Sequence, residues 1–323
     1  MKGAILFSST NAASLNIVKH LESDWKWKKR ADLLYSFSSC AKEDCCTGVQ
    51  AFGSPKSIIE IEPPAELCEG PKAVDYFLYA STHKSESGQP ALTAHVPGNW
   101  NAADFGGSPK TLNTAYAGKL KQILQLLAEG AKKHGLDWPV NMEVDHHGPT
   151  PSRGARGSAP SPQFQGEQAY RRPARASPAG LARPRADSCS PDLRPPLFPA
   201  LIFVEIGSGP GQWENELAGQ VVAEAMMKAL FRPAPPASVY LGIGGGHYAP
   251  KFTHVMLESE KAVGHVLPKY HAASFDAAML KQAMEKTVEK VEGALVDWKG
   301  LGKEERDRIV ALLEKEGVKY KRA

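Results

Sequence analysis

Residues 201–231 read LIFVEIGSGPGQWENELAGQVVAEAMMKALF, an apolar run followed by a glycine-rich turn and a helical pattern. The run Leu201–Ile206 is short and almost continuously apolar, which is typical of a strand covered on both faces. Residues 213–231 predict the helix that follows it. A strand that passes through a tight turn into a helix is the building unit of α/β folds.

The same alternation continues along the rest of the chain. Further strands are expected at Ala4–Phe7, Ser57–Ile61, Tyr76–Ala80, Val140–Val144 and Val239–Ile243. Further helices are expected at 11–23, 109–134, 273–295 and 303–316. In the second of these, Ser108 is expected to cap the start, Pro109 to occupy the first turn and Gly135 to close the end. The pattern predicts a three-layer α/β/α fold with a mixed sheet between helices.

Composition excludes several classes of protein. The 323 residues include 42% hydrophobic residues, and 39 basic against 35 acidic residues give a net charge of only +4. A disordered or fibrous chain would hold fewer apolar residues. No run reaches the roughly 18 apolar residues of a membrane helix, and the start lacks a secretory signal. Five unevenly spaced cysteines suit a reducing compartment, so we expect a soluble cytoplasmic protein that could also be nuclear.

Residues 151–199 differ from the rest of the chain. They contain ten of the 25 prolines, eight arginines, no lysine and three acidic residues, a net charge of +5 that leaves −1 for the remainder. They show no helical or strand periodicity, which indicates a disordered insertion without a role in the fold. The alternative is a flexible RNA-binding arm. The expected organisation is a catalytic α/β domain in two parts, 1–150 and 200–323, separated by the insertion.

The loops expected at strand ends carry most of the unusual side chains. Ligands in α/β folds gather at the carboxyl ends of strands, and six of the ten histidines lie in three such loops. Adjacent side chains in an extended segment point apart, so only one of His146 and His147 is expected to face a site, as ligand or base. Glu205 interrupts an apolar strand, and a buried acid without a partner is costly. The glycines Gly244–Gly246 would let backbone N–H groups approach a substrate closely.

Three simpler interpretations of glycine-rich or cysteine-containing segments do not fit the sequence. FVEIGSGPGQW resembles the first motif of S-adenosylmethionine-dependent methyltransferases, but the next strand lacks the acidic residue that would bind the ribose. LGIGGGHYAPK lacks the spacing of a phosphate-binding P-loop. Cys45 and Cys46 have no second cysteine pair at a spacing that suits zinc.

Four blocks of sequence resemble the archaeal- and plant-type D-aminoacyl-tRNA deacylases. They are SSTNAASLNI, THKSESGQPALTAHVPGN, the pair HHGPT with FVEIGS, and GIGGGHYAPKFT. The resemblance runs from residue 1 to about residue 300, apart from the insertion, which departs from the family pattern. Asp145 also departs from it, since a small hydroxyl residue is expected before the histidine pair. Asp145 is therefore a poor ligand candidate.

The resemblance implies a zinc-dependent hydrolase that removes a D-amino acid from the 3′ end of mischarged tRNA. Plant members are linked further to aldehyde-modified D-aminoacyl-tRNA. The implied architecture is similar to phosphorylase- and peptidyl-tRNA-hydrolase-like α/β folds. The cofactor is expected to be Zn²⁺, in undetermined number, and the partner a tRNA carrying a D-amino acid. Nothing indicates a membrane or an obligate protein partner, and a monomer is expected.

If the protein is a zinc-dependent ester hydrolase, the unusual side chains have the following expected roles. The candidate metal ligands are His83, His95, His146, His147, His247 and Glu205. The candidate catalytic residues are His83, His147, His247 and Glu205. The candidate substrate-binding residues are Gly244, Gly245, Gly246, Lys251 and Asn99. A patch of lysines is expected to contact the acceptor stem, namely Lys110, Lys119, Lys121, Lys132 and Lys133.

Two other functions remain open on the sequence alone. One is a metal-dependent hydrolase of a small amide or ester, which the near-neutral body favours because RNA binders are often basic. The other is a tRNA- or nucleoside-binding protein without hydrolytic activity.

Overall fold

The computed structural model describes residues 1–37, 49–69, 73–150 and 198–323. The prediction that 151–199 is a disordered insertion falls almost wholly outside these residues. Cys45 and Cys46 also lie outside them. None of the helices in the described ranges has the length and apolar character that crossing a bilayer requires.

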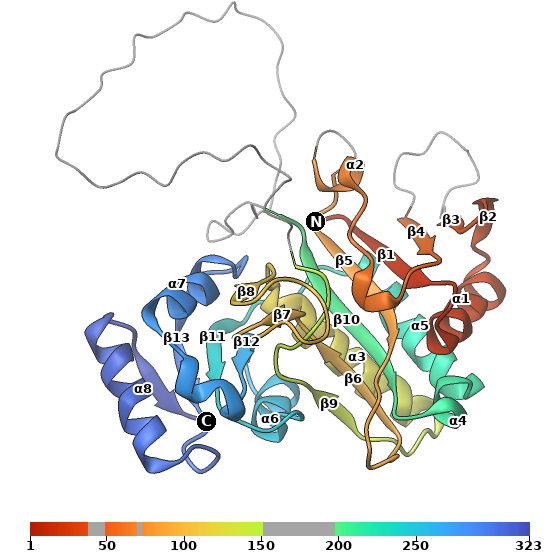
Figure 1. Ribbon diagram of the computed structural model, residues 1–323. Coiled ribbons are helices and arrows are strands. Elements are labelled where there is room, and N and C mark those ends of the chain that lie inside the picture. Colours follow the sequence, from red (N-terminus) through yellow and green to blue (C-terminus); the bar gives the residue numbers. More distant parts are fainter. Residues whose placement is uncertain (38–48, 70–72, 151–197) are drawn as a thin grey trace, which may run out of the picture.

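The larger of two main sheets is mixed, as predicted (Figure 1). Its eight strands lie in the order β2-β3-β4-β1-β5-β10-β6-β9. They are β1 Gly3–Ser8, β2 Lys28–Ala31, β3 Leu34–Phe37, β4 Val49–Ser54, β5 Tyr76–Thr82, β6 Ala91–His95, β9 Val140–Met142 and β10 Ala200–Gly207. Strand β10 pairs in parallel with β5 and antiparallel with β6. Residues from both sides of the insertion therefore build one sheet, while the domain boundaries stay a prediction.

A second sheet, which the sequence pattern did not predict, forms the other lobe. Its strands are all parallel, in the order β12-β11-β13-β14. They are β11 Ser238–Ile243, β12 Lys261–Leu267, β13 Val291–Val296 and β14 Tyr320–Arg322. The helices α6 Pro250–Glu258, α7 Ala277–Glu285 and α8 Lys303–Lys315 belong to this lobe. A short antiparallel pair, β7 Gly98–Asn99 and β8 Thr111–Leu112, lies near the junction of the lobes.

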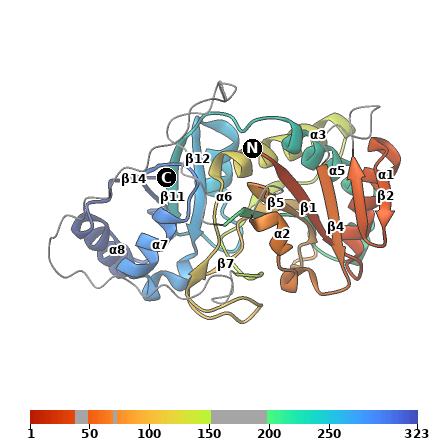
Figure 2. The same cartoon turned by 90° about the horizontal axis from the view of Figure 1, so that it is seen from above.

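The two faces of the large sheet are covered differently. Helices α1 Ala12–Trp25, α3 Ala117–His134 and α5 Glu216–Phe231 pack on one face, against Ile5, Leu78 and Ile202 among others. The opposite face, with Leu6, Tyr79 and Phe203, is covered by the short helices η1 Ile58–Glu60 and α2 Ala65–Cys68. Figure 2 shows α2 on the side of the sheet away from α3 and α5. The second outer layer is thus much thinner than a regular α/β/α arrangement.

Three predicted elements were wrong in type or extent. Residues 109–116 are not helical, because Thr111 and Leu112 pair with β7 and the Leu112 N–H donates to Gln282. Residues 273–295 split into α7 and β13, and Ser57–Ile61 holds the 3₁₀ helix η1 instead of a strand. Gly135 does close α3, with φ of 72°. Tertiary pairing decided these segments against their local pattern.

Asn16 links the helical layer to the loop that carries His83. This buried side chain donates to the carbonyls of Trp213 and Asn215, at 2.9 and 2.8 Å. Trp213 ends helix α4 (Pro210–Trp213), and its indole N–H donates to the carbonyl of His83 at 2.9 Å. The start of α5 and the position of His83 therefore depend on one buried amide.

We expect Asn16→Ala to lower the free energy of unfolding by about 1–3 kcal/mol, because two partly buried carbonyls lose their donor. The melting temperature should fall by a few degrees. The control is Leu15→Ala on the same helix, where the side chain is exposed and the change should stay within about 0.5 kcal/mol. Equal melting temperatures for the two variants would show that Asn16 does not hold this junction.

Candidate active site

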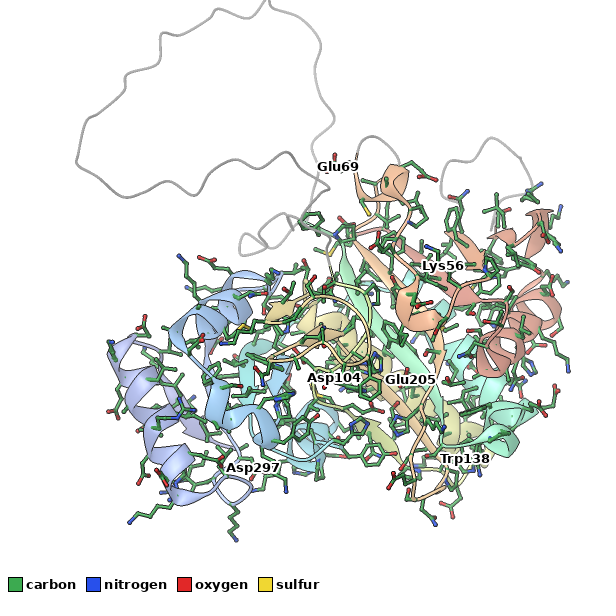
Figure 3. The ribbon with its side chains drawn as sticks, viewed as in Figure 1. Lys56, Glu69, Asp104, Trp138, Glu205 and Asp297 are labelled. Carbon is green, nitrogen blue, oxygen red and sulfur yellow. The ribbon has the colours of Figure 1, made fainter. Side chains whose placement is uncertain are left out.

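Histidines and glutamates from five segments meet where the two lobes adjoin. His83 follows β5, His95 ends β6, Glu205 lies on β10 and His247 follows β11. Residues 143–147, which follow β9, supply the rest. The lobes are joined here because the Val144 N–H donates to the carbonyl of His247 at 3.1 Å. Figure 3 labels Glu205 on β10, near the middle of the molecule.

Glu143 lies at the centre of this cluster and is fully buried. Its Oε1 is 3.0 Å from Nδ1 of His83. Its Oε2 is 3.3 Å from Nε2 of His247, 3.4 Å from Nε2 of His146 and 3.7 Å from Nδ1 of His95. One carboxylate therefore contacts four imidazoles.

Glu205 is the second buried carboxylate of the cluster. Its Oε2 lies 3.7 Å from Nδ1 of His83 and 4.0 Å from Nδ1 of His95, and it accepts a hydrogen bond from Thr93 at 3.4 Å. Burial raises the pKa of Glu205 to about 7, and the charge of Glu143 adds to this effect while His83 opposes it. Burial also opposes ionisation of Glu143, but hydrogen bonds from His247 and His83 outweigh it and hold its pKa well below the usual range.

One histidine of the cluster, His83, has a raised pKa and favours the charged imidazolium form. Three others have lowered pKa values and favour the neutral form. Burial would lower the pKa of His83, but hydrogen bonds to Glu143 and Glu205 raise it to about 11. Burial lowers the pKa of His146 to about 4 and holds those of His95 and His147 well below the usual value. Neutral imidazoles with a free nitrogen lone pair are the form that binds metal ions.

Apart from the contacts between imidazoles and carboxylates given above, several buried polar atoms of the cluster have no hydrogen-bond partner among the described residues. They are both ring nitrogens of His95, both carboxylate oxygens of Glu143, Nδ1 of His147 and Oε1 of Glu205. Unpaired buried polar atoms cost free energy, and a bound cation would satisfy these. Three groups in the described residues bring ligand atoms within 4.8 Å of one another, namely His95 with His146 and His147, His83 with Glu143 and His247, and His95 with Glu143 and Glu205.

Both histidines of the pair face the cluster, so the prediction that only one would do so was wrong. The His95 ring stacks on His146 at 4.3 Å and meets the edge of His147 at 4.9 Å. Alternation requires an extended strand, and β9 has already ended at Met142. The left-handed backbone of His147, with φ of 41°, turns its side chain to the same side.

Comparison with known proteins identifies the family of this chain. The family model described as D-aminoacyl-tRNA deacylase matches residues 71–321. The chain belongs to the D-aminoacyl-tRNA deacylase family. It is 34% identical to the D-aminoacyl-tRNA deacylase of Thermococcus kodakarensis, with 98% of each chain covered. It is 31% identical to that of Methanosarcina acetivorans, covering 98% of this chain and 91% of the relative.

A solved structure shares the fold of this deacylase family member. It belongs to a conserved protein of unknown function and is 24% identical in sequence. The TM-score is 0.74, with 99% of this chain and 95% of that chain covered.

Glu143 was missed in the sequence of this deacylase family member, although a signal was present. It interrupts the apolar strand Val140–Val144 in the way that Glu205 interrupts its own strand, and it stands three residues before His146. Tyr248 was also missed: its hydroxyl lies 2.9 Å from Nε2 of His83. Asp145, predicted to be a poor ligand, pairs instead with the buried His265 at 2.6 Å.

Three of the five predicted substrate-binding residues, Gly244, Lys251 and Asn99, use their donor groups within the fold. The Gly244 N–H donates to the carbonyl of Leu267, so it is not available to a substrate. The Lys251 ammonium lies 3.8 Å from Asp297 and donates to the carbonyl of Ala323. Asn99 donates to the carbonyls of Gly106 and Ser108, which holds the β7–β8 loop.

The predicted lysine patch is only partly available. Lys119 and Lys121 are 2% and 4% exposed. They donate to backbone carbonyls that include those of Ala229 and Met256. These two ammonium groups bind carbonyls near the carboxyl ends of α5 and α6 and are too buried to reach tRNA, so that part of the prediction was wrong.

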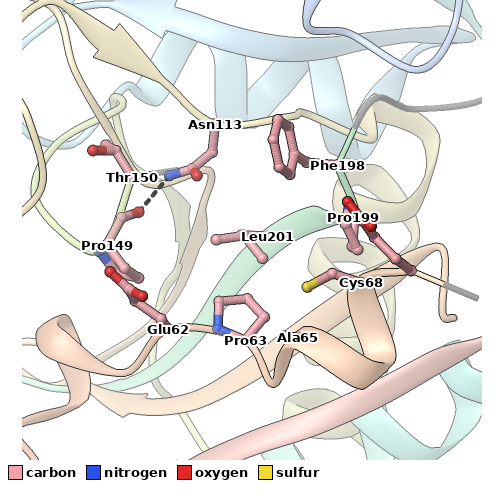
Figure 4. A pocket seen from close by; sticks show the side chains of 11 residues that line it. Glu62, Pro63, Ala65, Cys68, Asn113, Pro149, Thr150, Phe198, Pro199 and Leu201 are labelled. Atoms are coloured by element: carbon pink, nitrogen blue, oxygen red, sulfur yellow. Dashed lines mark hydrogen bonds between the residues drawn. The ribbon is translucent and has the colours of Figure 1, made fainter. Parts of the chain in front are cut away.

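A separate pocket of about 290 Å³ opens beside the residues that follow the histidine pair (Figure 4). Pro63, Ala65, Cys68 and Leu201 line it, and Asn113 donates to the carbonyl of Pro149 at 2.7 Å beside it. Phe203 stands between Leu201 and Glu205 on the same face of β10, and its ring contacts His95. Among the described residues, no histidine lines this pocket, so it is distinct from the cluster.

In protein freed of metal by a chelator, we expect Glu143→Gln to lower the pKa of His83 from about 11 towards its ordinary 6.5. The charged imidazole would lose its nearest carboxylate while its burial remained. Nuclear magnetic resonance titration of the histidine side chains measures this directly. The control is Glu224→Gln, which removes the partner of His134, a histidine outside the cluster. Identical titration of His83 in both variants would contradict the central position of Glu143.

Proposed function

We propose that this protein hydrolyses the ester bond of D-aminoacyl-tRNA and releases the D-amino acid and free tRNA. Membership of the deacylase family gives the reaction, and the buried cluster around Glu143 is the observation that carries the assignment of the site. Ester hydrolysis needs an activated water, stabilisation of the tetrahedral intermediate and a proton for the leaving ribose oxygen. The cluster offers groups for each of these needs.

The cluster fits zinc, the cofactor that the resemblance implies. Histidine nitrogen and glutamate oxygen are ordinary zinc ligands, and catalytic sites use three of them. Two of the three groups share no member: His95 with His146 and His147, and His83 with Glu143 and His247. We therefore propose that these two groups hold zinc, and that His83 would release its proton when the ion binds. When bound, zinc supplies Lewis acidity that activates water and a carbonyl at neutral pH.

Two of the proposed ligands are already oriented by their remote ring nitrogens. Nδ1 of His146 lies 2.8 Å from the carbonyl of Val144, so its Nε2 is directed at the cluster. Nε2 of His83 lies 2.9 Å from the Tyr248 hydroxyl, so its Nδ1 is the nitrogen that faces Glu143. Metal-binding histidines commonly have this second contact, which fixes the tautomer and the ring plane. Tyr248 is accordingly proposed to position His83.

Glu205 remains for proton transfer once the two groups are assigned. Burial and the charge of Glu143 raise its pKa above the ordinary range of a carboxylate, which favours accepting and returning a proton. We propose that it takes a proton from the attacking water and delivers one to the ribose oxygen. Thr93 holds the carboxylate in place. D-amino acids are selected by geometry, because both enantiomers carry the same chemical groups.

Finer features of the proposal rest on the family resemblance. We propose that the protein acts in chiral proofreading as a monomer in the cytoplasm, on aldehyde-modified D-aminoacyl-tRNA as well. We also propose that its fold is related to the phosphorylase- and peptidyl-tRNA-hydrolase-like α/β folds.

The expected result with matched D- and L-tyrosyl-tRNA is rapid release of the D-amino acid only. A chelator should abolish this release, and added zinc should restore it. Alanine at His83, His147 or His247 should lower the rate at least about a hundredfold. Release of labelled amino acid from tRNA measures each rate.

His134→Ala is the matched control, since His134 pairs with Glu224 away from the cluster and should keep full activity. Activity that survives the chelator would remove zinc from the proposal. Hydrolysis of small D-amino acid esters without hydrolysis of aminoacyl-tRNA would instead indicate a small-substrate hydrolase. Binding of tRNA without any release would indicate a binding protein.

A further inference from the structure

Two exposed aromatic residues belong to segments whose backbones hydrogen-bond to the segments that carry the histidine cluster. The exposed large hydrophobic residues in the described ranges are Met1, Leu15, Phe105, Phe231 and Tyr270. Phe105 is 68% exposed and Tyr270 is 52% exposed. Exposed apolar groups cost solvation free energy, so aromatic rings at the edge of a site point to a ligand with flat apolar faces.

Phe105 is tied to the segment that carries His147. It lies in the loop between β7 and β8, and its carbonyl accepts a hydrogen bond from the Gly148 N–H at 3.2 Å. The next residue is held as well, because Asn99 donates to the carbonyl of Gly106 at 2.8 Å. The backbone under the Phe105 ring is therefore fixed next to the cluster.

Tyr270 is tied to the segment that carries His247. It lies in the first turn of the 3₁₀ helix η2 (Lys269–Ser274), and the Lys269 N–H donates to the carbonyl of Gly245 at 2.9 Å. Burial of the hydroxyl raises the pKa of Tyr270 to about 12, and the carboxylates of Glu143 and Asp145 add to this effect. The backbone that carries Tyr270 is therefore attached to the segment that carries His247, while half of the Tyr270 side chain stays exposed.

The segments that carry Phe105 and Tyr270 contact each other through neighbouring residues. The Trp100 and Phe275 rings meet at 5.8 Å, edge to face. The Lys110 ammonium lies 3.1 Å from the Asp276 carboxylate. Phe105 and Tyr270 are therefore carried by two connected supports that reach the cluster from the His147 side and the His247 side.

We propose that Phe105 and Tyr270 form a stacking platform for the unpaired bases at the 3′ end of the tRNA. This inference rests on the proposed function. Every tRNA ends in the same single-stranded CCA sequence, and the scissile ester is on its last nucleotide. Aromatic side chains stack on unpaired bases, and this contact tolerates any base because each has a π face.

The net charge of the protein supports base stacking as the way in which the 3′ end of the tRNA is bound. The chain outside residues 151–199 has a net charge of −1, and Lys119 and Lys121 are buried. A broad set of phosphate contacts is therefore not available from the described body, and stacking supplies affinity without basic residues. Because the aromatic platform would contact bases and not the ester, its loss should weaken binding and leave the chemical step unchanged.

The test is steady-state deacylation of D-tyrosyl-tRNA by Phe105→Ala, Tyr270→Ala and the double variant. Each single change should raise KM at least about fivefold, since one base stack accounts for that much or more, with kcat within about twofold. Phe105→Trp and Tyr270→Phe keep a ring and should keep KM near the wild-type value. Leu15→Ala, another exposed hydrophobic residue, should change nothing.

The CCA trinucleotide carrying D-tyrosine separates base stacking from contacts to the rest of the tRNA. The same rise in KM on the trinucleotide is expected. An unchanged KM in the double variant, a loss confined to kcat, or a loss seen with tRNA and not with the trinucleotide would each overturn the platform. If the wild type deacylates neither substrate, the proposed function fails. Fluorescence-detected binding of uncharged CCA trinucleotide to the same variants then still tests the platform.

Discussion

The Glu143 carboxylate is the constraint on which the rest of the site depends. It is fully buried and contacts His83, His146 and His247 within 3.4 Å, while His95 lies 3.7 Å away. The backbone on either side of it pairs with the other lobe, through the bridge to Tyr248. The residue that organises the charges of the cluster therefore also joins the two lobes.

Burying several ionisable groups this close together lowers the stability of the fold. Glu143 and Glu205 approach the same His83 Nδ1 atom, and burial disfavours the charge of each carboxylate. A protein tolerates such a site where function needs it and the surrounding core is large enough. The strands β5 and β10 supply that core, because their inner residues are fully buried.

Much of the fold and part of the site could be predicted from the sequence. The apolar runs at Tyr76–Ala80 and Leu201–Ile206 are strands, and their carboxyl ends do carry His83 and Glu205. The predictions that were wrong concerned residues whose structure depends on partners far away in the sequence. Leu112 pairs with β7 instead of starting a helix, and Lys119 finds buried carbonyls that no local pattern reveals. Glu143 carried the same signal as Glu205, an acidic residue inside a segment expected to be a buried strand.

The most direct measurement is X-ray diffraction from zinc-loaded crystals on both sides of the zinc absorption edge. The account predicts anomalous peaks inside the cluster, one beside His95, His146 and His147 and one beside His83, Glu143 and His247. In crystals of Glu143→Gln the second peak should weaken or vanish. Fully active protein with no anomalous peak at the cluster, or with zinc bound only elsewhere, would contradict the account.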